Sequence, residues 1–174
     1  MHAAHDDVLR MGRLVDDLLL LARLDAGAAR PARVLDLADV VRQVAPGAAA
    51  GKRLDLDLAP AQVRGDADAL GRLVRNLVEN AARHAGSGVV VTVAQPDGTA
   101  ELLVDDDGPG IPVADRERVF DRFARVDSPR SRAAGGSGLG LAIAREVAGA
   151  AGGGIEVLDA PGGGARLRVR LPGA

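Results

Sequence analysis

Two asparagines and a basic pair within residues 76–84 are the first residues whose spacing suggests chemistry. Asn76 and Asn80 are four apart, so on a helix they share one face. Arg83 and His84 follow one turn later. An amide oxygen is a hard ligand of the kind that Mg²⁺ binds, and a guanidinium is a natural partner of phosphate. Taken alone, this segment is better explained as a solvated helix face that carries two ordinary asparagines.

A second candidate is the run Asp-Asp-Gly-Pro-Gly-Ile at residues 106–111, directly after an expected strand. Gly108 and Gly110 lack a Cβ, so a ligand can come close to the backbone. The ionised carboxylate of Asp106 can accept a hydrogen bond from an exocyclic amine such as that of adenine. The alternative is a simple acidic turn, in which Asp-Gly and Gly-Pro pairs are common.

A third candidate is the glycine-rich run at residues 135–141, Gly-Gly-Ser-Gly-Leu-Gly-Leu, which leads into an expected helix. The free N–H groups and the positive dipole end of a helix N-terminus bind phosphate. The run lacks the Lys-Ser/Thr of a phosphate-binding P-loop, and it matches Gly-x-Gly-x-x-Gly only loosely. On its own it is a weak signal, and a flexible hinge is the alternative.

The composition limits the classes of function. The chain has 174 residues, 47% of them hydrophobic, which is enough for the core of one domain with a short appendage. The formal net charge of −2 argues against nucleic acid as a partner. The lack of cysteine excludes disulfides, thiolate metal sites and a cysteine nucleophile. No apolar run approaches the roughly 20 residues that span a bilayer.

Residues 6–24 are expected to form an amphipathic helix at the start of the chain. Apolar residues recur at the spacing of a heptad seam, at Val8, Met11, Val15, Leu18 and Ala22, and three leucines widen this stripe, Leu14, Leu21 and Leu24. A single helix of this length is marginal in water, and its apolar stripe needs a partner. That partner is either the rest of its own domain or a second copy of the helix.

The apolar patterns of the remaining residues predict one α+β domain. Helices are expected over residues 37–44, 66–85 and 139–151, with a short one over 116–123. Strands are expected over residues 54–58, 63–65, 89–94, 101–104, 155–158 and 165–171. Helices that cover one face of a hairpin-rich sheet make a two-layer sandwich. Residues 125–136 are polar and rich in glycine, serine and arginine, and we expect them to be mobile.

The order of these segments resembles that of one family, the histidine kinases. An Asn-x-x-x-Asn helix, a hairpin, Asp-x-Gly-x-Gly, Phe-x-x-Phe at residues 120–123 and Gly-x-Gly-x-Gly before a helix resemble the family's N, G1, F and G2 boxes. The superfamily also contains DNA gyrase, MutL and the ninety-kilodalton heat-shock chaperones. Residues 14–25 are similar to the end of the family's second dimerisation helix, and residues 162–172 to its last strand. The resemblance implies a Bergerat-type ATP-binding fold, a mixed sheet covered by about three helices and preceded by one amphipathic helix.

The same resemblance implies ATP and Mg²⁺ as cofactors and suggests a role for each matching residue. Asp106 would recognise the adenine amine, Asn80 would hold Mg²⁺, and Asn76 would lie close to the phosphates, so that these asparagines are the expected catalytic pair. Arg83 would contact phosphate oxygens, and His84 would lie against the adenine ring. Residues 122–135 would form a lid over ATP. The other residues expected at the nucleotide are Gly108, Gly110, Ile111, Phe120, Arg122, Gly136, Ser137, Gly138, Leu139, Gly140 and Leu141.

The implied activity is transfer of the ATP γ-phosphate to a histidine on a dimerisation domain, with a response regulator as a further partner in two-component signalling. The family's phosphoacceptor box, His-Glu-Leu-Arg-x-Pro-Leu, does not occur in this sequence, and His2 and His5 lie within the part similar to the second dimerisation helix. We therefore expect a protein-histidine kinase that is incomplete without a phosphoacceptor domain. The expected divisions are a remnant of the dimerisation helix (1–27), a linker (28–33) and the ATP-binding catalytic domain (34–174). We expect the chain to be cytoplasmic, as such or as the cytoplasmic part of a membrane-bound sensor kinase. A homodimer could form through the N-terminal helix.

Two alternatives to the kinase remain open at this point. One is a non-catalytic ATP-binding regulatory module, in which the nucleotide only switches a surface. The other is an anti-sigma-factor serine kinase of the same superfamily, against which the dimerisation-like helix argues, because those kinases usually lack one.

Overall fold

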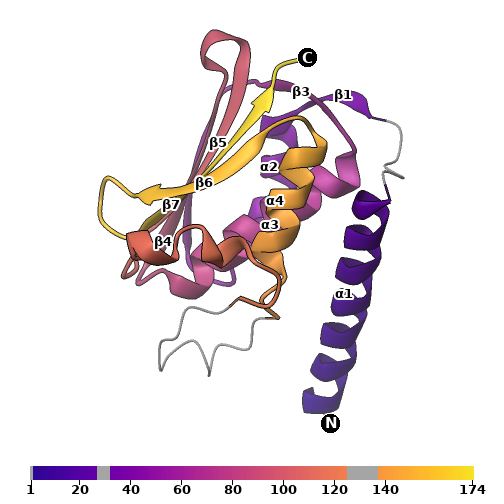
Figure 1. Cartoon of the computed structure of the whole chain (residues 1–174). Coiled ribbons are helices and arrows are strands. Elements are labelled where there is room, and N and C mark those ends of the chain that lie inside the picture. The colour runs from indigo at the N-terminus through magenta and orange to yellow at the C-terminus, as the bar shows by residue number, and fades with distance from the viewer. Residues whose placement is uncertain (1, 27–31, 125–136) are drawn as a thin grey trace.

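The chain folds as a two-layer sandwich preceded by a long helix. The computed structural model describes residues 2–26, 32–124 and 137–174. After α1 (His2–Asp25), three helices cover one face of a sheet (Figure 1): α2 (Leu37–Ala48), α3 (Ala67–His84) and α4 (Gly140–Ala150). This arrangement confirms the expected α+β class and the expected layer of about three helices. None of the helices in the described ranges is long and apolar enough to cross a bilayer.

A five-stranded mixed sheet forms the second layer, in the order β2-β4-β5-β7-β6. Its strands are β2 (Arg53–Leu58), β4 (Gly88–Ala94), β5 (Thr99–Asp106), β6 (Gly154–Asp159) and β7 (Ala165–Pro172). The β2–β4 pair is parallel, and the other three pairs are antiparallel. Two further strands, β1 (Arg33–Asp36) and β3 (Gln62–Gly65), pair with each other in a separate antiparallel ribbon. The expected strand at residues 63–65 is therefore present outside the main sheet, and β1 has no counterpart among the expected strands.

The central strand β5 shows how the side-chain alternation of the sheet positions a polar group. Ala100, Leu102 and Val104 are buried against the helix layer. Because side chains on a strand alternate between its two faces, the next inward position is Asp106, the last residue of β5. The alternation that builds the apolar core therefore also turns one carboxylate toward the helices.

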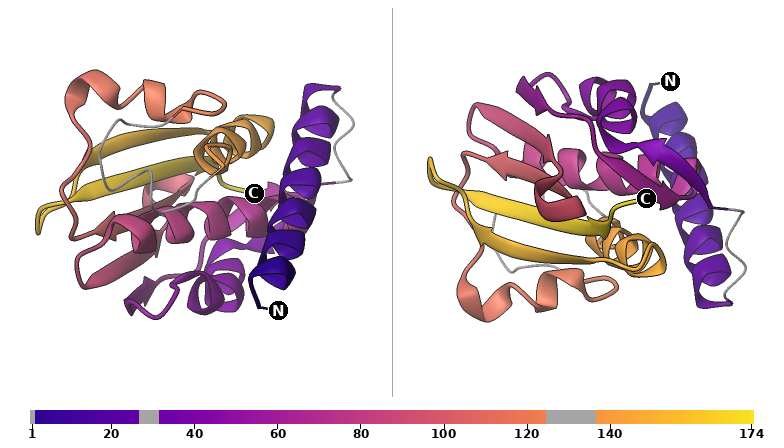
Figure 2. Two further views of the ribbon diagram at one scale, coloured as in Figure 1. Left: turned by 90° about the horizontal axis from the view of Figure 1, so that it is seen from below. Right: turned by 90° about the horizontal axis from the view of Figure 1, so that it is seen from above.

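The face of the sheet that points away from the helices carries pairs of oppositely charged side chains. Three arginines of β7 form hydrogen-bonded pairs with acidic residues of both neighbouring strands: Arg166 with Asp105, Arg168 with Glu156, and Arg170 with Glu101. Opposite charges on adjacent strands stabilise their pairing. Figure 2 shows that the three covering helices lie on the inner side of the sheet.

Helix α1 stands outside the sandwich and contacts it along one side (Figure 2). Leu21 is buried, and the Asp17 carboxylate accepts a 2.7 Å hydrogen bond from Arg72 of α3. Burial raises the pKa of Asp17, and the positive charge of Arg72 opposes this rise. A second side of α1 is exposed and apolar, with three positions of the expected heptad seam and one neighbour between 50% and 59% exposed: Met11, Val15, Leu18 and Leu19. The domain itself thus covers one side of the helix and leaves the other side exposed.

The predicted end of α2 was wrong. The helix does not stop before Pro46 but continues to Ala48. Proline lacks an N–H and so removes one hydrogen bond of the helix. Ala45 and Ala48 are both buried, and this burial holds the last turn of the helix in place.

The prediction of a short helix over residues 116–123 was also wrong. Two 3₁₀ turns, Val113–Asp115 and Arg118–Phe120, replace it. Phe120 is the one residue of these turns that is fully buried, so the segment has no apolar stripe to hold a longer helix.

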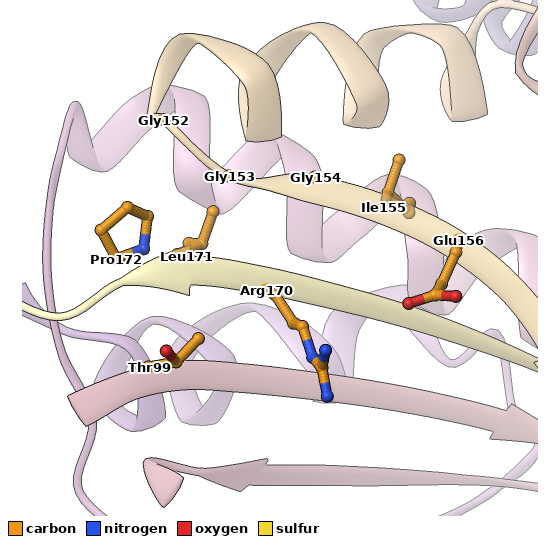
Figure 3. A pocket seen from close by; sticks show the side chains of 9 residues that line it. All are labelled: Thr99, Gly152, Gly153, Gly154, Ile155, Glu156, Arg170, Leu171 and Pro172. Atoms are coloured by element: carbon orange, nitrogen blue, oxygen red, sulfur yellow. The ribbon is translucent and has the colours of Figure 1, made fainter. Parts of the chain in front are cut away.

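Helix α4 ends just before a run of three glycines, residues 152–154. Gly152 has a φ of +78°, and the N–H of Gly153 donates to the Ala148 carbonyl at 2.9 Å. This is the Schellman pattern of a helix C-terminus. Gly153 then passes against β7 (Figure 3), where a Cβ would lie 2.0 Å from the Arg170 carbonyl oxygen. The turn therefore both ends α4 and seats β6 on β7.

We expect Gly153→Ala to lower the free energy of unfolding by about 1–3 kcal/mol, because the added methyl group must displace backbone in a packed region. Gly154→Ala is the matched control, since a Cβ at Gly154 meets no atom within 4 Å. Urea denaturation of both variants measures the difference. Equal stability of the two variants would show that the turn can move away from β7 at little cost.

Candidate functional site

Asp106 lies at the centre of the candidate site, with its side chain buried at the end of β5. Its Oδ1 accepts hydrogen bonds from the backbone N–H of Gly108 at 2.9 Å and of Ala165 at 3.3 Å. Within the described ranges no donor is found on Oδ2. An ionised carboxylate can accept a hydrogen bond at each oxygen, so Oδ2 is the atom that could accept one from an amine of a ligand.

The buried environment of Asp106 disfavours the ionised form of its carboxylate. Burial raises its pKa, while the N–H donors of Gly108 and Ala165 and the nearby His84 act in the opposite direction. Since the net shift is upward, the ionised form is less stable here than in water. Groups with such shifts gather at functional sites, although structural charges also show them.

Three glycines allow separate backbone segments to close around Asp106. A Cβ at Gly108 would lie 2.3 Å from the His84 carbonyl oxygen, which is shorter than any real contact. Gly164, in the turn between β6 and β7, has a φ of +84°, and a Cβ there would lie 2.0 Å from the Asp106 carbonyl oxygen. Gly110 has a φ of +76° and packs against the Gly164 carbonyl. These contacts bring together the end of α3, the turn after β5 and the β6–β7 turn.

The polar edge of α3 faces the start of α4. Asn76 and Asn80 are half-buried, one turn apart on α3. The Nδ2 atom of Asn76 is buried and has no hydrogen-bond partner among the described residues. A Cβ at Gly140, the first residue of α4, would lie 3.5 Å from Asn76 Oδ1. Because an unpaired buried donor is costly, the Asn76 amide fits a site whose polar partner comes from a ligand such as phosphate.

Arg83 and His84 are the last two residues of α3, and His84 lies near the Asp106 carboxylate. Both side chains keep contact with solvent. The partial burial of His84 lowers its pKa, the positive charge of Arg83 lowers it further, and Asp106 opposes the shift. The imidazole is therefore mostly neutral at pH 7, which suits contact with an aromatic base.

The segments on either side of residues 125–136 meet at Phe123 and Gly138. The N–H of Phe123 donates to the Gly138 carbonyl at 3.0 Å, and both residues have a positive φ, +65° and +72°. A Cβ at Gly138 would lie 2.9 Å from the Phe123 Cα, so only glycine fits there. Of the lid expected at residues 122–135, residues 125–135 lie outside the described residues, and so does Gly136.

The remaining residues expected at the nucleotide surround the start of α4. The Ser137 hydroxyl accepts a hydrogen bond from the Leu139 N–H at 3.3 Å just before α4 begins. Leu139 is buried, and Leu141 is half-buried on the first turn. Phe120 is buried beneath the Arg145 guanidinium of α4, 5.7 Å from its ring centroid, so its packing role is clear. Arg122 lies 3.9 Å from Glu146.

Arg116 is a member of the site region that no sequence pattern singled out. Its Nε donates to the Ile111 carbonyl at 3.1 Å, and its guanidinium also pairs with Asp159 at the end of β6. The side chain thus ties the turn that follows Asp106 to the β6–β7 hairpin. Gly164, which packs on that turn, had only the run of glycines at residues 162–164, between two expected strands, as a signal.

A pocket at the other end of β6 and β7 does not belong to this site (Figure 3). It lies beside the turn at residues 152–154, and its lining is mostly apolar. Its two charged side chains are already paired, Glu156 with Arg168 and Arg170 with Glu101. A second cavity is a groove between α1 and the helix layer, and the residues that line it do not include Asp106 or its neighbours.

Comparison with known proteins identifies the family to which this two-layer fold belongs. A family model described as "Histidine kinase-, DNA gyrase B-, and HSP90-like ATPase" matches residues 65–174. The chain belongs to this family, as the sequence motifs indicated.

The relatives of this chain narrow the family to sensor kinases. A probable sensor histidine kinase of Mycobacterium tuberculosis, TcrY, is 44% identical over 170 residues, which cover 94% of this chain and 36% of TcrY. The solved mycobacterial sensor histidine kinase MprB matches at 36% identity with a TM-score of 0.72, over 82% of this chain and 97% of that one. The structure of full-length ShkA in complex with AMPPNP matches at 30% identity with a TM-score of 0.77, over 95% of this chain and 36% of ShkA.

These matches confirm the expected identity of the domain. The chain corresponds to the ATP-binding catalytic domain of a sensor histidine kinase, and it spans about a third of the length of the curated relatives it matches. Because the named relatives are histidine kinases, they favour the kinase over the anti-sigma-factor alternative.

Asp106→Asn is expected to stabilise the nucleotide-free domain at pH 7–8 while leaving its shape unchanged. The folded-state pKa of Asp106 lies above the ordinary 3.8, so the folded state binds its proton more tightly than the unfolded state. Its contribution to stability is fully present below pH 3.8 and is lost as pH rises through the folded-state pKa. Thermal melts across pH 4–8 should therefore show the variant gaining on the parent as pH rises.

Asp97→Asn, in the exposed turn between β4 and β5, is the control and should follow the parent at every pH. A lower melting temperature for Asp106→Asn at pH 8 would mean that the buried charge stabilises the fold, contrary to the direction of its pKa shift.

Proposed function

We propose that this domain binds MgATP at the residues gathered around Asp106 and transfers the γ-phosphate to a histidine of a dimerisation domain. The observation that carries the proposal is the buried Asp106 carboxylate, which has one oxygen engaged by backbone N–H groups and the other free of described donors. A domain that keeps such a charge needs a compensating ligand, and the family binds ATP.

Asp106 would select adenine by the polarity of its acceptor oxygen. The exocyclic amine of adenine donates a hydrogen bond, whereas guanine carries a carbonyl at the corresponding ring position. Facing that carbonyl, a carboxylate would leave two acceptors in contact and a buried charge unpaired. His84, mostly neutral and beside Asp106, would lie against the base. Gly108, Gly110 and Ile111 would let the backbone approach it.

The polar edge of α3 would hold the phosphates and the metal ion. Mg²⁺ bound to a nucleotide is coordinated by phosphate oxygens and waters with one or two protein ligands, so the single amide oxygen of Asn80 suffices. Asn76, with its unpaired Nδ2 next to Gly140, would donate toward the phosphates at the start of α4. Arg83, in the last turn of α3, would neutralise phosphate charge. ShkA, a relative at 30% identity, was solved with AMPPNP, an ATP analogue.

Catalysis at such a site consists of positioning and charge stabilisation. The attacking imidazole must lie in line with the bond that breaks between the γ-phosphorus and the bridging oxygen, and charge develops on the phosphoryl oxygens. Asn76 and Asn80 would hold these oxygens and their metal ion in place. The segments that meet at Phe123 and Gly138 flank the proposed lid, residues 122–135, which with Arg122, Phe120 and the 136–141 run would complete the enclosure.

The wider organisation is proposed on the same basis. Residues 1–27 are assigned to the dimerisation helix, 28–33 to a linker and 34–174 to the catalytic domain. The exposed apolar side of α1 would form a homodimer contact, because a solvent-facing row of Met11, Val15 and Leu18 has the spacing of a helix–helix seam. A response regulator would receive the phosphoryl group, and the use of ATP as donor implies a cytoplasmic location.

Calorimetry is expected to show adenine-specific binding that Mg²⁺ strengthens, with micromolar affinity, or about 6–8 kcal/mol. Asp106→Asn should weaken ATP binding by about tenfold or more, the equivalent of one charged hydrogen bond. Asn80→Ala should instead reduce the gain that Mg²⁺ provides. Equal binding of GTP and ATP by the unmodified chain would remove the role of Asp106, and equal ATP binding with and without Mg²⁺ would remove that of Asn80.

Incubated alone with labelled ATP, the chain is expected to acquire little label, because its sequence contains no phosphoacceptor box. A separately added dimerisation domain with an intact box should be labelled, though slowly, since no tether raises the effective concentration. The same acceptor with its histidine changed to glutamine is the control. Strong labelling of the chain that His5→Gln abolishes would contradict the assignment of the first helix.

A further inference from the structure

The connector that leads from the end of α3 into the first residue of β4, residues 85–88, is held from two sides by side chains of opposite charge. It is short and contains Gly86 and Gly88, so its own sequence does little to fix its path. It links His84, the last residue of α3, to the strand that lies between β2 and β5. Its position therefore determines how the end of α3 lies relative to the end of β5.

Lys52 holds the carbonyl side of the connector. Its Nζ donates to the Ala85 carbonyl at 2.9 Å and to the Gly86 carbonyl at 3.2 Å. The Arg53 N–H donates to the next carbonyl, that of Ser87, at 3.3 Å. A cation at the C-terminus of a helix also suits the negative end of the helix dipole. Lys52 is the only lysine among 22 basic residues of the chain, and its compact ammonium group can reach two adjacent carbonyls.

Asp107 holds the amide side of the same connector. Its carboxylate accepts hydrogen bonds from the Ser87 N–H at 3.0 and 3.1 Å, from the Gly88 N–H at 3.2 Å and from the Ser87 hydroxyl. The hydroxyl and then the two amides lower the pKa of Asp107 well below its usual value, so the carboxylate stays ionised. In addition, a Cβ at Gly86 would lie 3.3 Å from the Asp107 carbonyl oxygen, so the two segments are already in contact.

The two anchors converge on the nucleotide site because Asp107 directly follows Asp106. The connector that Asp107 holds begins one residue after His84, and the His84 carbonyl lies against Gly108. A shift of the connector would therefore move the imidazole and the Asp106 carboxylate relative to each other. Neither Lys52 nor Asp107 needs to contact the ligand for this effect.

We propose that Lys52 and Asp107 are positioning residues of the nucleotide site, which hold the connector at residues 85–88 from opposite sides and so fix the distance between His84 and Asp106. The inference rests on the proposed assignment of the adenine pocket to those two residues. It distinguishes Asp107 from Asp106, although they are neighbours of the same type: Asp106 would face the base, and Asp107 would face the protein.

The test compares Asp107→Ala and Lys52→Met with two matched controls in the full chain. Asp97→Asn changes an exposed acidic turn residue, and Arg42→Met removes an exposed cation of α2. Each variant is measured for ATP affinity by calorimetry, for melting temperature, and for the imidazole pKa of His84 by NMR. The His84 resonance is identified by its loss in His84→Gln. Asp107→Asn, which keeps an acceptor oxygen, is the milder variant should Asp107→Ala fail to fold.

Asp107→Ala is expected to weaken ATP binding by about tenfold and Lys52→Met by about threefold, through loss of connector hydrogen bonds. The double variant should lose less than the product of the two effects, because both side chains hold one connector. The pKa of His84 should rise toward its ordinary value in each, since a loosened connector lets more water surround the partly exposed imidazole. Asp107→Asn should show a smaller effect in the same direction, and both controls should match the parent.

A fall in melting temperature with unchanged ATP affinity and unchanged His84 pKa would show that the two side chains only stabilise the fold, and the proposal would be wrong. Asp106→Asn, measured in parallel, separates this failure from that of the proposed function. If Asp106→Asn weakens ATP binding while the connector variants do not, only the positioning role is overturned. If Asp106→Asn has no effect either, the assignment of the adenine pocket is overturned together with the inference built on it.

Discussion

The candidate site depends on the close approach of three backbone segments around one buried carboxylate. Asp106 is turned inward by the same alternation that places Leu102 and Val104 in the core. Its oxygen can be satisfied there only because Gly108 and Gly164 lack side chains, so that the chain can fold back against it on both sides. The apolar core and the polar site are therefore one construction, and the sheet that supplies stability also sets the direction of the carboxylate.

Much of the fold could be predicted because its signals are local. The apolar face of α3, capped by Asp66, and the alternation in β5 and β7 are visible in short windows of sequence. Strand β1 and its pairing with β3 escaped prediction, because β1 has only four residues and the pairing joins positions about thirty residues apart. The 3₁₀ turns before Phe123 were misjudged as a helix because a short apolar spacing looks the same in both.

The site shows the same division between local and distant information. The motifs around Asn76, Asp106 and Gly138 were found because each lies in one continuous segment. Arg116 and Gly164 were not, since their distant partners, Asp159 and Asp106, are brought to them only by the completed sheet. In an arginine-rich chain, the sequence around one arginine does not indicate which residue it pairs with. Likewise, the sequence around a turn glycine does not indicate which carbonyl group packs against it.

Helix α1 has a mechanical property that follows from its buried and exposed sides. Leu18, on the exposed side, and Leu21, on the buried side, are three residues apart on one helix, about 4.5 Å along its axis. A helix is stiff against twisting over such a distance. In a pair of chains joined along the exposed sides, rolling one helix against the other would apply a torque directly to the sandwich, with the Asp17–Arg72 pair at its point of attachment. Rotation of α1 about its own axis, against the helix of the second chain, would thus displace the attached catalytic domain.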